Sequence, residues 1–261
     1  MPPRNGKIAD YDSVISEVFK RAAGACPSGN AFCFDKSLIE TVIDDLKKSG
    51  KIEAIRNIPD IKYTYDARKD FPSAIASTGY WAITGRGKAK YCFERIGRNN
   101  LIRIPADIAG LSPKTTKVND ATPQIVSAVL GNDEQATMTR VRYNDLLSKF
   151  MGFPVLHVQG HERTTLSCGQ VEIDEVYVGS KGGTHFVIPI SAKGGGKDCL
   201  SYTQALNLNI YATEKPRYHG HAPRPLGVLR DTSGVIHVIE FSTAKAINSV
   251  TMRRCASFVL V

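Results

Sequence analysis

The chain has 261 residues, of which 42% are hydrophobic and 23% are charged, a balance typical of globular proteins that bury a core. It contains no run of about 18 apolar residues, and its first residues lack the apolar stretch of a secretory signal. These patterns exclude a membrane-spanning helix and predict a cytoplasmic protein. The formal net charge of +9 favours a polyanionic partner, because lysine and arginine placed against phosphates gain Coulomb energy and release counterions.

In chain order, two amphipathic helices come first, because apolar residues recur at helical spacing over 14–22 and 38–46. The second helix is predicted to open with a capping box, Ser37 to Glu40, and to stop at Ser49-Gly50. Short β-like runs follow, around residues 61–65, 80–83 and 89–96. Two helices followed by a β-ribbon are typical of a winged helix, so residues 1–104 are interpreted as a winged-helix-like DNA-binding domain.

A basic stripe runs through that ribbon, where six basic residues stand against the single acid Glu94. Its candidate DNA-binding residues are Arg86, Lys88, Lys90, Arg95 and Arg98. By the period of two along a strand, Lys88 and Lys90 would share the face that meets phosphate, while Tyr91 and Phe93 pack inward. The alternative is a solvated edge strand whose charges guard against aggregation.

The cysteines are spread along the chain without the C-x-x-C pairs that structural zinc sites favour. We expect them to be reduced, mostly buried thiols. They are Cys26, Cys33, Cys92, Cys168, Cys199 and Cys255.

Residues 105–132 are rich in Pro, Thr, Ser and Asp and are interpreted as a linker with a short helix near 123–130. The second part then alternates helical and strand-like patterns and is predicted to form a mixed α/β core over 133–261. Its predicted helices cover 133–150 and 197–211, and its predicted strands cover 154–159, 170–178, 185–192, 226–230 and 235–241.

Two of these strands carry charged residues although their apolar neighbours predict that the strands are buried. Glu172 and Asp174 are two residues apart and project from one face, so their mutual repulsion and desolvation favour a cation between them. A divalent metal is the natural candidate. The next strand is apolar until Ser191-Ala192-Lys193, where a lysine emerges that can reach the same site. Beside a metal, such a lysine could orient the water that attacks a phosphodiester.

An acid on one strand followed by a triplet ending in lysine on the next resembles the PD-(D/E)XK nuclease superfamily. The match covers about residues 133–241 and implies a restriction-endonuclease-like mixed sheet flanked by helices, with Mg²⁺ as cofactor. Asp174 matches the metal-binding aspartate, Lys193 the lysine and Ser191 the first position of the triplet, and Gln204 resembles a glutamine that many members place near the site. The flanking stretches Asp133-Glu-Gln and Arg163-Thr-Thr also look like restriction-endonuclease-like bacterial proteins.

Serine at 191 departs from the acidic residue of the superfamily pattern, so a second metal-binding carboxylate must come from Glu172 or Glu134. The predicted metal-site residues are thus Asp174, Glu172, Glu134 and Ala192. Just before the acidic strand, His161, Arg163 and Thr164 form a polar cluster that either contacts DNA or is an ordinary polar turn.

The resemblance implies a magnesium-dependent endonuclease, most simply a type II restriction enzyme that cuts a short duplex sequence. Cutting two antiparallel strands most simply uses a homodimer, and a restriction role implies a cognate DNA methyltransferase. Two other functions stay open, namely a non-catalytic DNA-binding regulator with a degenerate nuclease core and a structure-specific or repair nuclease. A structural alternative is that Glu172, Asp174 and Lys193 form only a surface salt-bridge cluster.

Overall fold

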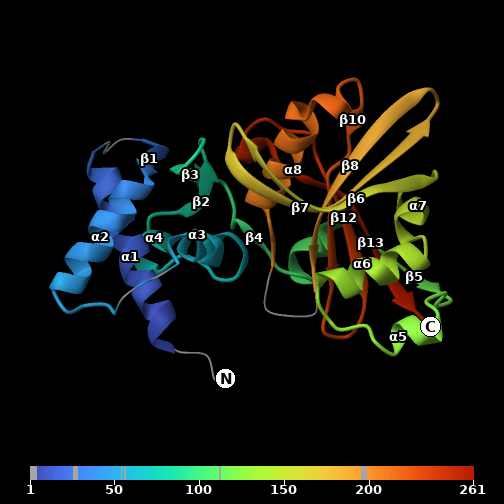
Figure 1. Ribbon diagram of the computed structural model, residues 1–261, viewed down its shortest axis with the longest axis horizontal. Helices are drawn as coiled ribbons and strands as arrows, with labels where there is room; N and C mark the ends of the chain where they lie inside the picture. The colour runs from blue at the N-terminus through green and yellow to red at the C-terminus, as the bar shows by residue number, and fades with distance from the viewer. Residues whose placement is uncertain (1–4, 26–28, 54, 56, 112, 195–198) are drawn as a thin grey trace. The chain divides into compact units, whose positions relative to one another are not determined.

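The computed structural model describes the whole chain except residues 1–4, 26–28, 54, 56, 112 and 195–198 (Figure 1). It divides into two compact units. Unit 1 comprises Met1–Leu101 and Ser167–Gln170, and unit 2 comprises Ile102–Leu166 and Val171–Val261. Among the described residues, none of the helices combines the length and the apolar character needed to cross a membrane.

Unit 1 is built from helices packed on a three-stranded sheet. The helices are α1 (Asn5–Gly24), α2 (Lys36–Lys48), α3 (Ile58–Ala67) and α4 (Ser73–Ala76). The strands β1 (Ala31–Asp35), β2 (Tyr80–Gly85) and β3 (Lys90–Ile96) pair antiparallel in the order β1-β3-β2. Phe19 of α1 contacts the rings of Phe32, Trp81 and Phe93 at centroid distances of 5.7, 5.1 and 5.0 Å, so an aromatic cluster joins α1 to the sheet.

Two details of unit 1 differ from the sequence predictions. The predicted β-like run at 61–65 is wrong, because these residues lie inside α3, where Ile61 and Tyr65 are one helical turn apart and both buried. The N-cap of α2 is Asp35 rather than Ser37, since the Asp35 carboxylate accepts a hydrogen bond from the N–H of Leu38 at 3.1 Å. The predicted end of this helix is confirmed at Ser49, which is followed by Gly50 at φ +68°.

The expectation that all cysteines are reduced is wrong for one pair. Cys33 of β1 lies directly opposite Cys92 of β3, and the two form a disulfide. They are 59 residues apart in the sequence, so only the strand register brings them together. Cys168, Cys199 and Cys255 are partly buried, whereas Cys26 lies outside the described residues.

Unit 2 is built around an eight-stranded mixed sheet. Seven strands follow the order β5 (Lys114–Val118), β13 (Met252–Leu260), β12 (Ile236–Phe241), β11 (Leu226–Arg230), β8 (Thr184–Lys193), β7 (Gly169–Lys181) and β6 (Val155–Leu166). The short strand β10 (Ala222–Pro223) adds to β8. Pairs β8–β11 and β13–β5 are parallel, whereas β7–β8, β11–β12 and β12–β13 are antiparallel. Strands β4 (Leu101–Ile102) and β9 (Leu200–Ser201) form a separate two-stranded sheet.

Helices cover both faces of this sheet (Figure 1). Ile188, Ile190 and Ala192 of β8 pack in one core with α6 (Glu134–Tyr143) and α7 (Leu146–Met151). Val187, directly before Ile188, packs in a second core with α8 (Tyr202–Glu214). Because neighbouring residues of a strand point to opposite faces, the helices lie on opposite sides. The predicted mixed α/β sheet flanked by helices is confirmed at this level.

The remaining differences lie between the predicted elements. Residues 105–132, expected to be a linker, contain η1 (Ala106–Leu111), strand β5 and α5 (Gln124–Ser127). Strand β13, at 252–260, was missed. The helix predicted over 133–150 is divided into two helices. Asn144 ends α6, and its side-chain amide donates hydrogen bonds to Asp120 and Thr122. The next residue, Asp145, has φ +49°, which interrupts the helical backbone. The helix predicted from 197 begins at Tyr202, and Ser201 caps it by accepting the N–H of Gln204 at 3.1 Å.

A buried ionic network fastens α7 and the sheet of unit 2. Glu240 of β12 is 2% exposed and accepts hydrogen bonds from Arg224 and Arg254. Arg254 also lies 4.2 Å above the ring of Phe150 and donates to the carbonyl of that residue. Burial alone would raise the pKa of Glu240, but the two arginines together lower it, so this carboxylate stays charged inside the fold.

Candidate metal centre

Glu172 and Asp174 lie on one face of β7. The buried residues Val171 and Ile173 alternate with the exposed Glu172 and the half-buried Asp174, as the sequence pattern indicates. Ile173 packs in the core under α8, so the two carboxylates turn away from that helix. The sequence therefore identified a pair of acids that the strand presents together.

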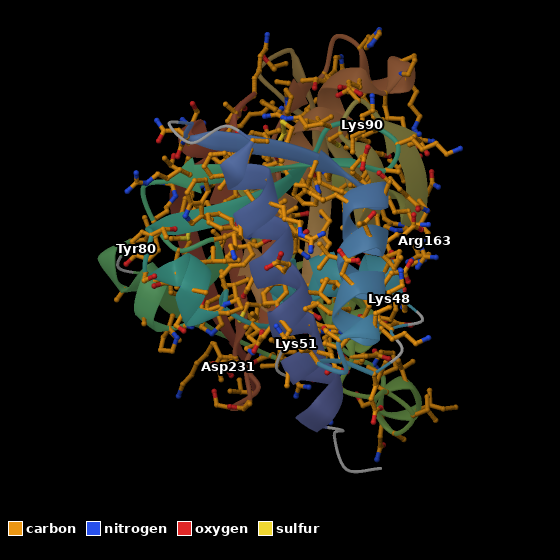
Figure 2. The ribbon with its side chains drawn as sticks, turned by 90° about the vertical axis from the view of Figure 1, so that its left-hand side faces the viewer. Lys48, Lys51, Tyr80, Lys90, Arg163 and Asp231 are labelled. Atoms are coloured by element: carbon orange, nitrogen blue, oxygen red, sulfur yellow. A yellow bond between two sulfur atoms is a disulfide. The ribbon has the colours of Figure 1, made fainter. Side chains whose placement is uncertain are left out.

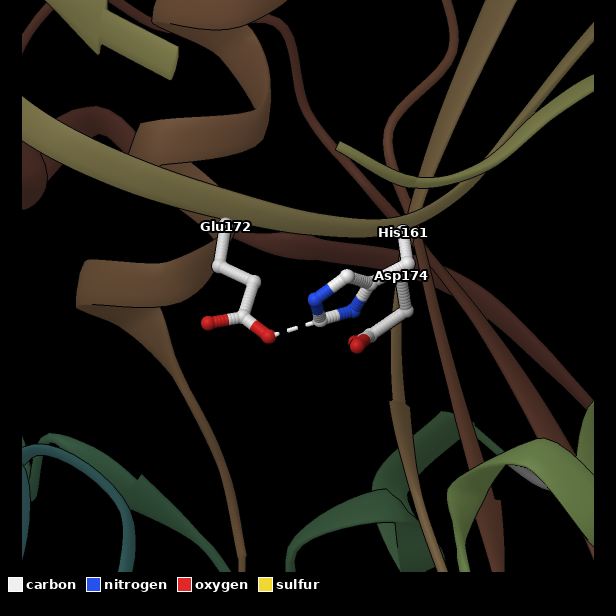
Figure 3. A group of neighbouring side chains, drawn as sticks. All are labelled: His161, Glu172 and Asp174. Atoms are coloured by element: carbon white, nitrogen blue, oxygen red, sulfur yellow. Dashed lines mark ion pairs between the residues drawn. The ribbon is translucent and has the colours of Figure 1, made fainter. Parts of the chain in front are cut away.

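His161 of β6 joins these two acids, a grouping that the sequence did not predict (Figure 3). One potential ligand atom from each of His161, Glu172 and Asp174 lies within 4.8 Å of the others. Nδ1 of His161 is 3.3 Å from Glu172 Oε1, and Nε of Arg163 is 3.0 Å from Glu172 Oε2. The predicted DNA contacts His161 and Arg163 are thus both held against a predicted metal ligand.

The backbone of β6 explains how His161 reaches the acids. His161 has φ +44°, in the left-handed region that few residues other than glycine adopt within a strand. The next residue, Glu162, turns toward α8, where it accepts a hydrogen bond from Tyr211 and pairs with Arg217 and with Lys215 at 2.7 Å. Neighbouring side chains are therefore anchored to different partners, and His161 is aimed at Glu172.

Asp174 and Lys193 lie where β7 and β8 leave their regular ladder. That ladder runs from Glu175 opposite Ile190 to Lys181 opposite Thr184. Next to its end, the N–H of Ala192 donates to Asp174 Oδ2 at 2.7 Å, so a side chain takes the place of a main-chain acceptor. Lys193 is only 5% exposed. Ile190 and Ala192 face the core with α6 and α7, so Lys193, the next residue along β8, leaves the strand on the opposite face, which α8 covers. The positive charge of Lys193 nevertheless acts to lower the pKa of Asp174.

The electrostatics of Asp174 favour a cation. Burial raises the pKa of its carboxyl, and the charges of Glu172 and Glu134 raise it further. The Ala192 N–H and the Lys193 ammonium act in the opposite direction without cancelling the increase. A carboxylate in this position is therefore costly to ionise unless further positive charge is bound.

Glu134 reaches the site because α6 begins beside the end of β8. It is the first residue of α6, after the N-cap Asp133, whose side chain accepts the N–H of Ala136 at 2.8 Å. A Cβ on Gly194, the residue after Lys193, would lie 2.5 Å from the carbonyl oxygen of Asn132. Only glycine therefore allows the two segments this close. Glu134 stays outside the 4.8 Å group, but its charge is felt by Asp174.

Two residues carried over from the superfamily pattern lie outside the cluster of His161, Glu172 and Asp174. Ser191 is buried in β8 opposite Gly227 of β11. Gln204 lies in the first turn of α8, and its buried Oε1 has no hydrogen-bond partner among the described residues. A buried acceptor costs free energy when no donor meets it.

The sequence analysis missed a third acidic position on β7. Glu175 is 1% exposed, accepts a hydrogen bond from Tyr177 at 2.6 Å and lies 3.7 Å from Arg142 and 3.8 Å from His157. Burial, and then the bond to Glu175, raise the pKa of the Tyr177 hydroxyl. An acid directly after Asp174 breaks the alternation of the strand, and that was the available signal.

The candidate DNA-binding residues of unit 1 lie at two places: Arg86, Lys88 and Lys90 are at the β2–β3 turn, whereas Arg95 and Arg98 are at the other end of β3. Lys90 is exposed at the start of β3 (Figure 2), and Lys88 is exposed in the turn itself rather than on the strand. Arg86 is paired with Glu94 at 2.8 Å. Arg95 is exposed, Arg98 is half-exposed, and in unit 2 Thr164 is half-buried beside Arg163. As expected, Phe93 is buried, and Tyr91 is half-buried.

Comparisons of the chain with protein-family models, with curated proteins and with solved structures find no match. The chemistry of the site must therefore be argued from its residues. Carboxylate oxygens are the donors that Mg²⁺ and Mn²⁺ accept, and an imidazole nitrogen adds a donor that transition metals favour. His161, Glu172 and Asp174 offer donors that suit a divalent cation, and the positive charge of Lys193 acts on Asp174.

Proposed function

We propose that the chain is a metal-dependent endonuclease that hydrolyses phosphodiester bonds of duplex DNA, with a restriction-endonuclease-like fold and a PD-(D/E)XK-type site in unit 2. One observation carries the proposal: the carboxylates of Glu172 and Asp174 converge with His161, and the positive charge of Lys193, whose side chain is 5% exposed, acts on Asp174. An acidic pair that attracts a divalent cation, beside a lysine that attracts an anion, suits a phosphodiester.

Each residue has a role in this chemistry. Asp174 and Glu172 would hold the cation, and Glu134 is the reserve carboxylate in place of the acid that Ser191 lacks. A divalent ion supplies positive charge against the phosphate and lowers the pKa of water near it. Lys193 would orient the attacking water, which adds to phosphorus as the ester P–O bond breaks. The phosphate stays on one new end, and the other new end leaves as a hydroxyl.

Arg163 connects the metal site to the substrate. Its ion pair with Glu172 joins side chains that are 62% and 43% exposed, and pairs this exposed contribute about 0–1 kcal/mol. A divalent cation bound to Glu172 would therefore displace the guanidinium at little cost. The released Arg163 could then bind a DNA phosphate through two parallel hydrogen bonds.

Unit 1 would bind the duplex as a winged-helix-like domain and so contribute to the affinity for DNA. Its element order, α1-β1-α2-α3-α4-β2-β3, and its sheet order, β1-β3-β2, support this proposal, because they match the arrangement of a winged helix apart from the short additional helix α4. The exposed Lys88 and Lys90 at the β2–β3 turn would meet phosphate. Phosphate contacts position a protein on DNA, whereas contacts to base edges specify the sequence.

The test is incubation of supercoiled plasmid with the full-length protein and Mg²⁺, with EDTA as the control. The proposal predicts nicked or linear plasmid only with the metal. Sequencing of the ends separates the subclasses. Defined ends on ordinary duplex support a type II restriction enzyme, for which we propose a homodimer and a cognate methyltransferase. Cleavage confined to junctions or damaged DNA supports a structure-specific nuclease.

One observation favours a second candidate function, a non-catalytic DNA-binding regulator. Ser191 stands where the triplet acid is expected, and serine is a weaker metal ligand than a carboxylate. DNA binding without any nicking at saturating Mg²⁺ would support the regulator over the nuclease.

A further inference from the structure

We infer that His161 is a third protein ligand of the metal centre and that the site consequently selects a transition-metal ion such as Mn²⁺ over Mg²⁺. The inference rests on the proposed metal site of Asp174 and Glu172 and names the ion which that site takes. In the sequence His161 was only a candidate DNA contact.

The backbone places the imidazole where a ligand is needed. Residue 161 takes φ +44° in an otherwise extended strand, and the His161 and Glu162 side chains are held by different partners. Strand irregularities of this kind re-aim side chains next to functional sites. Here the result is an imidazole Nδ1 3.3 Å from a carboxylate oxygen of Glu172 and inside the same 4.8 Å group as Asp174.

The donor set decides the ion. Mg²⁺ is a hard cation that prefers oxygen ligands and keeps several waters, so an imidazole adds little to its binding. Imidazole nitrogen binds first-row transition metals more strongly, and mixed nitrogen and carboxylate sites are typical of them. Two carboxylates with one imidazole therefore shift the preference from Mg²⁺ toward first-row transition-metal ions, and Mn²⁺, which also accepts carboxylate oxygens, is the ion that tests it.

A second observation indicates that the centre takes a ligand. The side chain of Lys193 is more than nine-tenths buried, and its positive charge acts on Asp174. An ammonium on a buried side chain is stabilised by an anion or a water molecule that meets it. Lys193 is therefore the place for the anionic substrate beside the cation.

The experiment measures Mn²⁺ bound to the full-length protein without DNA. Electron spin echo envelope modulation of bound Mn²⁺ detects an imidazole nitrogen in the coordination shell. The wild type should show this nitrogen signal, and His161→Asn should lose it. Asparagine tolerates the left-handed backbone of this position, so the variant should fold. The control is His185→Asn, since His185 is an exposed histidine of the same sheet whose ring contacts His221.

Titration of the same proteins gives the expected magnitude. Losing His161 should weaken Mn²⁺ binding at least about tenfold, because even residues that only orient ligands contribute that much. Mg²⁺ binding should change by less than about threefold, since magnesium relies on the carboxylates. His185→Asn should bind both ions like the wild type.

The outcomes separate this inference from the proposed function. Bound Mn²⁺ without a nitrogen signal, or with equal affinity in His161→Asn, overturns the inference and leaves the nuclease proposal standing. A nitrogen signal that depends on His161, in a protein that never cuts DNA, supports the inference and removes the nuclease. Failure of the wild type to bind Mn²⁺ overturns the inference, and failure to bind Mg²⁺ as well overturns the metal site on which both proposals rest.

Discussion

Replacing Asp174 with asparagine is expected to stabilise unit 2 while abolishing DNA cleavage. Burial and the charges of Glu172 and Glu134 raise the pKa of Asp174, so its ionised form is disfavoured in the metal-free fold. Asparagine removes the charge but keeps an oxygen that can accept the N–H of Ala192. Relief of such a functional strain commonly raises the free energy of unfolding by about 0.5–2 kcal/mol. In a protein of this size, 1 kcal/mol corresponds to about 2–4 °C in Tm.

The stability difference between the wild type and Asp174→Asn should depend on pH. Because the folded pKa of Asp174 lies above the unfolded value of about 3.9, the wild type loses stability relative to the variant as pH rises through the folded pKa. Near the unfolded pKa and below it the two proteins should unfold alike. Thermal unfolding in EDTA between acid and neutral pH measures the difference. With metal restored, cleavage should fall by at least about 10²–10³-fold, as when a transition-state charge contact is removed.

A matched control is Asp231→Asn in the β11–β12 turn. Burial opposes ionisation there too, but hydrogen bonds from Ser233, His237 and Val235 lower the pKa of Asp231. This variant should therefore lose about 1 kcal/mol of stability and cut DNA normally. The reasoning about Asp174 is refuted if Asp174→Asn unfolds more easily than the wild type in EDTA at neutral pH, or if it retains cleavage.

Three further predictions concern other parts of the molecule. Glu240→Gln should cost about 3–5 kcal/mol in urea unfolding at neutral pH, because it breaks a buried ion pair, and the cost should shrink as acid protonates the wild-type carboxylate through its lowered pKa. Arg163→Ala should tighten Mn²⁺ binding by freeing Glu172 and weaken DNA binding, and a parallel loss of both would contradict the displacement of Arg163. The double change of Lys88 and Lys90 to Ala should reduce the slope of log affinity against log salt by about 2, and an unchanged slope would remove them from the DNA interface.

Much of unit 2 could be predicted from the sequence because its central strands are apolar runs of the right length. Strands β7, β8, β11 and β12 lie close to their predicted ranges. Strand β5 was read as linker because its sequence, Lys-Thr-Thr-Lys-Val, is mostly polar and only tertiary pairing makes it a strand. Helix α3 was read as β-like because aromatic and β-branched residues dominate it, and packing of Ile61 and Tyr65 overrides that propensity.

Part of the candidate site could likewise be predicted from the sequence, and part could not. The shared face of Glu172 and Asp174 follows from the period of a strand and needed no structure. The position of the His161 side chain depends on the left-handed backbone conformation of His161 itself. The adjacent Gly160 is the only signal in the sequence for such an irregularity in the strand. The Cys33–Cys92 disulfide depends on strand register across 59 residues, which periodicity does not encode.

The measurement that bears most directly on the central claim is an anomalous-scattering map of crystals of the protein grown with Mn²⁺ and an uncleaved duplex. Our account predicts a single strong ion peak bonded to carboxylate oxygens of both Asp174 and Glu172, with a DNA phosphate between the ion and Lys193. An ion bound elsewhere, or duplex docked away from these three side chains, would contradict it.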